Sequence, residues 1–182
     1  FGVDERFSKV ISKDKSISIL KSKYPIPNSF LLALGVIYNR RNIDKLIKGY
    51  LKSNLYRSEI GLVIIGRNAT SPKIDIRNMM EKLEKERKGY YSAWAEEEEL
   101  NSWYRACEYY ITTSKVDGES IMLKEAIYCG TPVITSPLLS HSVKNNCLIV
   151  EDPEKIQDWI KLFNRIAVSY THLRANETEL HL

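Results

Sequence analysis

The sequence predicts an α/β domain, a single Rossmann-like unit with an open parallel sheet of six strands and helices on both faces. Short apolar runs alternate along the chain with stretches whose apolar residues recur at helical spacing, and this alternation is typical of βαβ units. A chain of 182 residues corresponds to about one domain. Its content of 43% hydrophobic and 27% charged residues is that of an ordinary globular protein.

The expected strands are near-continuous apolar runs, which is the pattern of strands that are buried on both faces. They occupy residues 30–35, 61–66, 90–91, 109–113, 132–135 and 147–150. A further short strand is expected at residues 17–19, inside a basic leading segment that covers residues 1–27. Open parallel sheets bind ligands beyond the carboxyl ends of their strands, so we expect a site at that edge.

The expected helices carry apolar residues at i, i+3, i+4 and i+7, which gather on one helical face. They cover residues 43–51, 76–88, 96–107, 119–129 and 156–166. The side chain of Asn42 is expected to cap the first of them. Trp103, Trp159 and the pair Met79 and Met80 lie on these apolar faces and are expected in the core.

Composition excludes several classes of protein. The net charge of +4, from 27 Lys and Arg against 23 Asp and Glu, is far below that of a dedicated nucleic-acid binder. No apolar run approaches the roughly 20 residues that span a bilayer, and no signal peptide is recognisable at the start. Cys107, Cys129 and Cys147 have neither metal-ligand nor redox spacing, so we expect free, buried thiols in a reducing compartment.

Basic residues gather in two places. Those between Arg6 and Lys23 are interpreted as solvated surface. A second group surrounds the start of the first strong helical pattern and consists of Arg40, Arg41, Lys45 and Lys48. For this group, contact with an anionic ligand or a membrane surface is as reasonable as a solvated surface.

The segment 114–134 carries the most specific chemistry. Asp117 falls at a strand-to-helix junction and Gly118 allows close backbone approach. The amides of residues 119–121 then open a helix, and such a terminus binds phosphate readily. Glu125 follows Asp117 by eight residues, two turns along the helix, so the two carboxylates can address both ends of one elongated ligand. Alone, Asp117 would be interpreted as an ordinary capping residue.

The sequence resembles the C-terminal half of the family-4 retaining glycosyltransferases, which have the GT-B fold. Residues 117–134 read D-G-E-S-I-M-L-K-E-A-I-Y-C-G-T-P-V-I, similar to the family segment E-G-F-G-L-P-x-L-E-A-x-A-x-G-x-P-V-I. Residues 1–7, 30–46, 61–66 and 98–106 resemble further family segments, so the likeness covers residues 1 to about 165.

The resemblance implies a role for each matching position. Glu125 would bind the ribose of a nucleotide diphosphate-sugar, and Asp117 would contact the transferred sugar as the catalytic residue. Diphosphate and sugar would be held by the helix start, Gly118, Glu119, Ser120 and Ile121. The turn at Ala93 and Trp94 would meet the base, although Trp94 is equally compatible with a core position.

Two positions near the first strand belong to the same implied site. The family has an Arg just after the Gly that corresponds to Gly35, and Val36 stands there in this sequence. A family Lys on the diphosphate corresponds to Arg41, whose alternative interpretation is a solvated cation. The resemblance implies transfer with retention to a glycan or lipid-linked glycan, with no metal and no cofactor besides the donor. A degenerate binding module without catalytic activity is the alternative.

The resemblance also divides the chain. The leading segment (1–27) precedes a nucleotide-sugar-binding domain (28–167), and residues 168–182 form a tail without clear period. This tail resembles a translated sequencing-adapter read-through and is expected to be non-native, a genuine polar arm being the alternative. The acceptor would be bound by an N-terminal domain absent from this sequence, so we expect the fragment to be inactive alone. The expected location is cytoplasmic, or peripheral on the inner face of the cell membrane.

Overall fold

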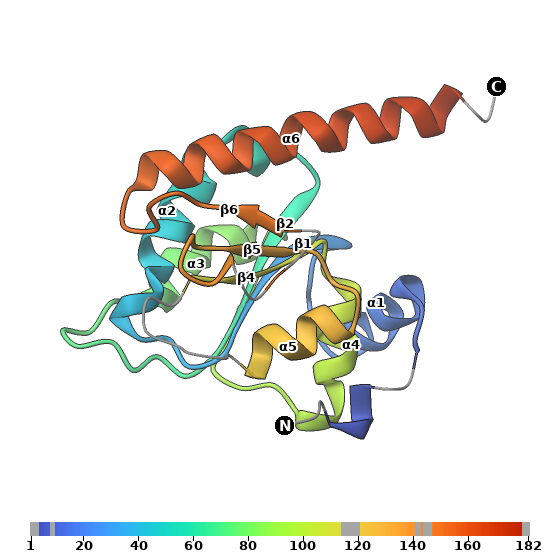
Figure 1. Ribbon diagram of the computed structural model, residues 1–182, viewed down its shortest axis with the longest axis horizontal. Coiled ribbons are helices and arrows are strands. Elements are labelled where there is room, and N and C mark those ends of the chain that lie inside the picture. The colour runs from blue at the N-terminus through green and yellow to red at the C-terminus, as the bar shows by residue number, and fades with distance from the viewer. Residues whose placement is uncertain (1–3, 8–9, 114–120, 141–142, 144–146, 180–182) are drawn as a thin grey trace.

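The computed structural model describes residues 4–7, 10–113, 121–140, 143 and 147–179, the last seven of these by their backbone only. Its six strands form one parallel sheet in the order β3-β2-β1-β4-β5-β6 (Figure 1). The strands are β1 (Ser29–Leu34), β2 (Ile60–Ile65), β3 (Gly89–Ser92), β4 (Tyr109–Thr112), β5 (Val133–Thr135) and β6 (Cys147–Ile149). Strand order reverses between β1 and β4, so the predicted fold class is confirmed.

Helices cover both faces of the sheet (Figure 1). One face is packed by α2 (Ile43–Lys52), α3 (Ile76–Lys85) and α6 (Ile156–Glu179). The other is packed by α1 (Lys13–Lys21), α4 (Leu100–Ala106) and α5 (Ile121–Tyr128). Trp159 and Met80 lie in the first core and Trp103 in the second, as predicted, and Met79 is partly buried.

The expected strand at residues 17–19 is wrong, because this segment lies within α1. The Ser12 side chain caps that helix by accepting a hydrogen bond from the Lys15 amide. Ser16 and Leu20 are buried one turn apart and face α4. The i, i+4 period therefore prevails over the β-branched Ile17 and Ile19.

Asn42 stands at the predicted start of α2, but its side chain does not cap the helix. Its backbone is left-handed, with φ of 52°, and its side-chain amide donates to the Arg40 carbonyl at 3.4 Å. The predicted cap was wrong because Asn42 also ends the preceding 3₁₀ helix η2 (Asn39–Arg41). That turn requires the left-handed conformation, which Asn tolerates well.

The expectation that helical structure ends near Ile166 is also wrong, since α6 continues to Glu179. No Gly or Pro interrupts residues 156–179. The hydroxyls of Ser169 and Thr171 donate to carbonyls one turn back, at 3.2 and 2.9 Å, so these polar side chains are satisfied within the helix. Figure 1 shows α6 extending past the rest of the domain. The non-native origin of residues 168–182 stays a prediction.

The three cysteines are free thiols, as predicted. Cys107 and Cys129 are buried and Cys147 is half-buried, so the expectation of burial is confirmed for two of the three. Among the described residues, no helix combines the length and the apolar character needed to cross a bilayer.

Candidate functional site

The carboxyl ends of β1 and β4 flank the point where strand order reverses, and Gly35 directly follows β1 there. Its φ of +112° is a conformation that favours glycine. A Cβ at this position would lie 2.6 Å from Met122 Sδ and 3.0 Å from Arg41 Nη1. The missing side chain thus allows the start of α5 and the Arg41 guanidinium to meet over the end of β1.

Arg41 lies at this edge as predicted, but it is not a solvated cation. Its exposed fraction is 8%, and its guanidinium donates to the Val36 carbonyl at 3.2 Å and the Leu34 carbonyl at 3.0 Å. The Thr113 hydroxyl, just after β4, donates to the Arg41 carbonyl at 2.9 Å. Among the described residues, Arg41 has no carboxylate partner. The two hydrogen bonds from its guanidinium go to neutral carbonyls, and a guanidinium held in this way can pair strongly with an anion.

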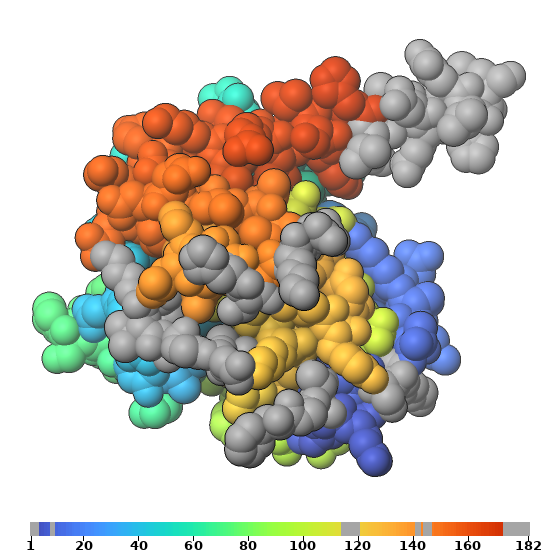
Figure 2. All heavy atoms as spheres, in the orientation of Figure 1, coloured from blue at the N-terminus to red at the C-terminus, as the bar shows by residue number. Residues whose placement is uncertain are grey.

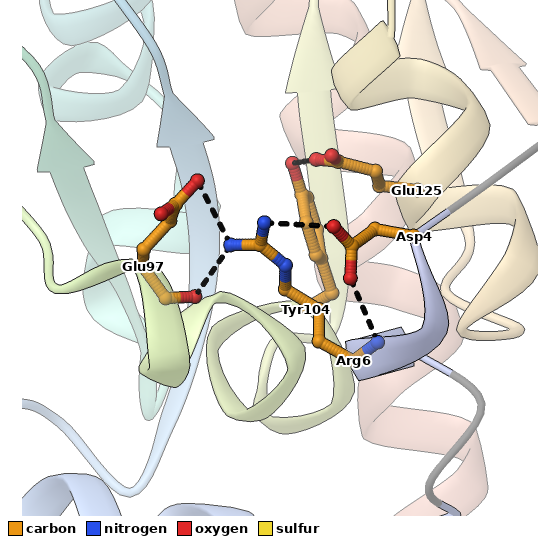
Figure 3. A network of polar contacts seen from close by, with 5 residues as sticks. All are labelled: Asp4, Arg6, Glu97, Tyr104 and Glu125. Carbon is orange, nitrogen blue, oxygen red and sulfur yellow. Dashed lines mark hydrogen bonds and ion pairs between the residues drawn. The ribbon is translucent and has the colours of Figure 1, made fainter.

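Glu125 projects from the second turn of α5 and is half-buried. The Tyr104 hydroxyl, from α4, donates to its Oε2 at 3.0 Å (Figure 3). Burial raises the pKa of the Glu125 carboxyl, and the hydrogen bond from Tyr104 opposes that shift. The nearby Arg6 also lowers this pKa, whereas Asp4 and Glu97 raise it.

The leading segment reaches this site through the 3₁₀ helix η1 (Glu5–Phe7), an arrangement that the sequence did not indicate. Arg6 pairs with Asp4 at 2.9 Å and with Glu97, in the 3₁₀ helix η4 (Glu97–Glu99), at 3.0 Å (Figure 3). The hydrogen bonds from Arg6 hold the pKa of Asp4 at about 2. Phe7 is fully buried against the Tyr104 ring, which anchors the segment beside Glu125.

The predicted base-contacting turn lies beyond the end of β3 and is open to solvent. Trp94 is 72% exposed and Ala93 is also exposed, so the core interpretation of Trp94 is wrong. The Ser92 hydroxyl donates to the Trp94 carbonyl at 2.7 Å and accepts from the Trp94 amide at 3.2 Å. These two bonds fix the turn and leave the indole ring free to contact a ligand.

The remaining predicted site residues belong to the segment before α5. Ile121 is the first residue of α5, and its side chain is 72% exposed. Figure 2 shows α5 (yellow) at the surface of the molecule. Asp117, Gly118, Glu119 and Ser120 lie outside the described residues.

Sequence reasoning missed Tyr104 and Arg6 as neighbours of Glu125. For Tyr104 the signals were its match to a family segment over residues 98–106 and its phenolic hydroxyl on an otherwise apolar helical face, but neither indicated a bond to Glu125. Within the described part of the chain, no group of three or more His, Cys, Asp or Glu is placed to hold a metal ion.

Fold and candidate site together define a Rossmann-like domain in which Gly35, Arg41 and the start of α5 meet at the reversal of strand order. The profile of the family described as "Glycosyl transferases group 1" matches residues 16–173. The chain therefore belongs to this family, as the C-terminal half of a GT-B fold.

Solved structures agree with the fold. The C-terminal domain of the glycosyl transferase group 1 family protein LpcC from Francisella tularensis superposes with a TM-score of 0.67 at 19% identity, covering 97% of this chain and 90% of that one. WaaG, a glycosyltransferase involved in lipopolysaccharide biosynthesis, gives a TM-score of 0.68 at 19% identity, covering 90% of this chain and 45% of that one.

Two curated relatives are similar in sequence. The mannosylfructose-phosphate synthase of Agrobacterium fabrum is 24% identical over 139 residues, which are 73% of this chain and 30% of that protein. The serotype-specific mannosyltransferase WbdA of Escherichia coli is 24% identical over 140 residues, which are 76% of this chain and 17% of that protein. The chain thus spans less than a third of the length of these relatives.

Proposed function

We propose that this domain binds the donor of a glycosyltransferase that moves a sugar from a nucleotide diphosphate-sugar to an acceptor with retention. The observation that carries the proposal is Arg41, a buried arginine without a carboxylate partner among the described residues, at the edge where strand order reverses. The diphosphate of a nucleotide sugar is a dianion, and bound there it would pair with the positive charge of the guanidinium.

Three further positions extend the proposed donor site from Arg41. The amide of Ile121, at the start of α5, faces the diphosphate, and helix starts favour negative charge. Glu125 accepts hydrogen bonds from the ribose hydroxyls, and the exposed Trp94 stacks on the base. Asp117 and residues 118–120 complete the site at the transferred sugar, as the resemblance implies.

The chemistry of this site is stabilisation of the leaving group. When the bond from the sugar to the diphosphate breaks, negative charge develops on the diphosphate oxygens. A fixed guanidinium and fixed amides stabilise that charge without reorganising, which lowers the barrier. The acceptor binds to the other half of the GT-B fold, so turnover requires both halves. Since two relatives are named for mannosyl products or transfer, mannose donors are the first hexose donors to test.

The test is calorimetric titration of the 182-residue chain with GDP-mannose and UDP-glucose. Arg41→Gln should weaken binding by about 1.5–3 kcal/mol, the usual loss for a charged hydrogen bond. Arg41→Lys keeps the charge and should lose less. Arg40→Gln is the matched control, because Arg40 lies over the Tyr38 ring at 4.4 Å and should leave affinity unchanged.

A second pair of variants tests the ribose end. Glu125→Ala should weaken nucleotide binding by about 1–3 kcal/mol, whereas Glu81→Ala, on the exposed side of α3, should not. Folding of every variant is checked by its melting temperature. If the folded wild-type chain shows no saturable binding of either nucleotide sugar, the proposed glycosyltransferase function is refuted and the alternative, a degenerate binding module without catalytic activity, is favoured.

A further inference from the structure

The side chain of Tyr104 is fixed from several sides. It is fully buried, and its ring packs edge-on against Tyr110, with 5.3 Å between the centroids, and tilted against Phe7 at 6.0 Å. Its hydroxyl emerges from this aromatic cluster at Glu125 Oε2, 3.0 Å away (Figure 3). A buried ring with two rotatable bonds holds its hydroxyl in one place, so the position of this donor is set by the core.

We propose that Tyr104 is a positioning residue that orients the Glu125 carboxylate for recognition of the ribose, an inference that rests on the function proposed above. Glu125 is a flexible side chain near the surface, and ordering it only on ligand binding would cost entropy. The Tyr104 hydrogen bond fixes one carboxylate oxygen beforehand. A carboxylate has about four lone-pair sites, so Oε1 stays available for a ribose diol. Preorganisation of this kind increases affinity without adding a contact to the ligand.

The protonation states fit this role. Burial raises the pKa of the Tyr104 phenol well above its usual value, so the hydroxyl keeps its proton and acts as donor. The charged groups that face Glu125 come from the leading segment and from η4: Asp4 just before η1, Arg6 within η1, and Glu97 in η4. Arg6 and the Tyr104 hydroxyl favour the ionised carboxylate, while Asp4 and Glu97 disfavour it. Removal of the hydroxyl should therefore raise the pKa of Glu125 further.

The variant that tests this is Tyr104→Phe, which removes the hydroxyl and keeps the ring. Tyr50→Phe is the matched control, because Tyr50 is equally buried and donates its hydroxyl to the Ile60 carbonyl at 2.7 Å on the other face of the sheet. Each protein is titrated with GDP and UDP and with their 2′,3′-dideoxy forms. The ratio of the two dissociation constants measures ribose recognition alone, because a general loss of folding or diphosphate binding affects both ligands equally.

Wild type and Tyr50→Phe should prefer the ribonucleotide by about tenfold or more, as expected for hydrogen bonds to a charged group. In Tyr104→Phe this preference should fall by about threefold or more. As pH is lowered, ribonucleotide affinity should decline in wild type as Glu125 takes up a proton. In the variant this decline should begin at a higher pH, because its Glu125 has the higher pKa.

The outcomes separate the two proposals. If the wild-type chain binds neither nucleotide, the proposed function fails. If it binds them with a ribose preference that Tyr104→Phe leaves intact, at the same pH midpoint, the positioning role fails while the proposed function stands. Where Tyr104→Phe lowers the melting temperature, titrations are made well below it, so that loss of folding cannot mimic the expected result.

Discussion

Gly35→Ala is the substitution that bears most directly on the packing of the proposed donor site. Its first cost is backbone strain, because a residue with a Cβ at φ of +112° is unfavourable by about 1–3 kcal/mol. Its second cost is overlap, since the new Cβ would lie 2.6 Å from Met122 Sδ. Because the far end of the Met122 side chain is flexible and can move aside, this overlap should cost about 1 kcal/mol, the low end of the range for overpacking. We expect Gly35→Ala to destabilise the domain by about 2–4 kcal/mol, the sum of these two costs.

Gly130→Ala separates the two costs. Gly130 also has positive φ, at +74°, but nothing lies within 4 Å of the position its Cβ would take. It therefore has only the backbone strain, and Gly35→Ala should cost about 1 kcal/mol more than Gly130→Ala. Both free energies of unfolding come from urea titration followed by circular dichroism. The same preparations are titrated with GDP-mannose, and only Gly35→Ala should lose affinity, because its Cβ displaces the Met122 and Arg41 side chains.

A double-mutant cycle with Met122→Ala gives the sharper result. Removal of the Met122 thioether creates room for the new Cβ, so Gly35→Ala should cost less in the Met122→Ala background than in wild type. Equal costs of Gly35→Ala and Gly130→Ala, together with no coupling to Met122, would show that the close approach over β1 is not as described.

Two more substitutions probe α2 and the exposed turn after β3. Gly49→Ala in α2 should destabilise the domain, because the added Cβ would overlap Cβ of Trp159 in α6. Overpacking costs about 1–3 kcal/mol, which outweighs the gain in helix propensity of about 1 kcal/mol. A higher free energy of unfolding in urea would contradict this packing of α2 against α6. Trp94→Ala should leave the free energy of unfolding within about 0.5 kcal/mol of wild type, because the side chain is exposed. It should weaken GDP and UDP binding by about 1–3 kcal/mol, because the base loses its stacking partner. Unchanged affinity in this titration would show that the indole does not contact the base.

The strands could be predicted because a strand that is buried on both faces appears in the sequence as a continuous run of apolar residues. All six positions of β1 and of β2 are buried, so apolar runs mark them without reference to neighbours. The wrong predictions concern helices whose extent depends on capping and tertiary packing and not on local residue preference. In α1, the Ser12 cap and the packing against α4 prevail over the β-branched Ile17 and Ile19. In α6, the helix continues through a polar stretch that has no amphipathic signal.

The candidate site was predictable as a set of positions and not as a set of contacts. The motif places Arg41 at the end of β1, yet its guanidinium turns toward the Leu34 and Val36 carbonyls, which only the folded loop brings within reach. Glu125 was identified from its spacing to Asp117. Its hydrogen bond to Tyr104 joins two helices, and no local pattern records such a pairing.

The two functional groups at opposite ends of the proposed donor site are connected through the core. The Leu34 carbonyl accepts from Arg41 Nη2 at 3.0 Å and from the Tyr110 hydroxyl at 3.4 Å. The Tyr110 ring packs edge-on against Tyr104, which in turn holds Glu125. Because both tyrosines are buried in a close-packed interior, the separation of cation and carboxylate is set by the core and not by flexible side chains. Under the proposed function, a ligand that carries an anion and a diol at this spacing would bind without first ordering its site, and shorter or longer ligands would lose that advantage.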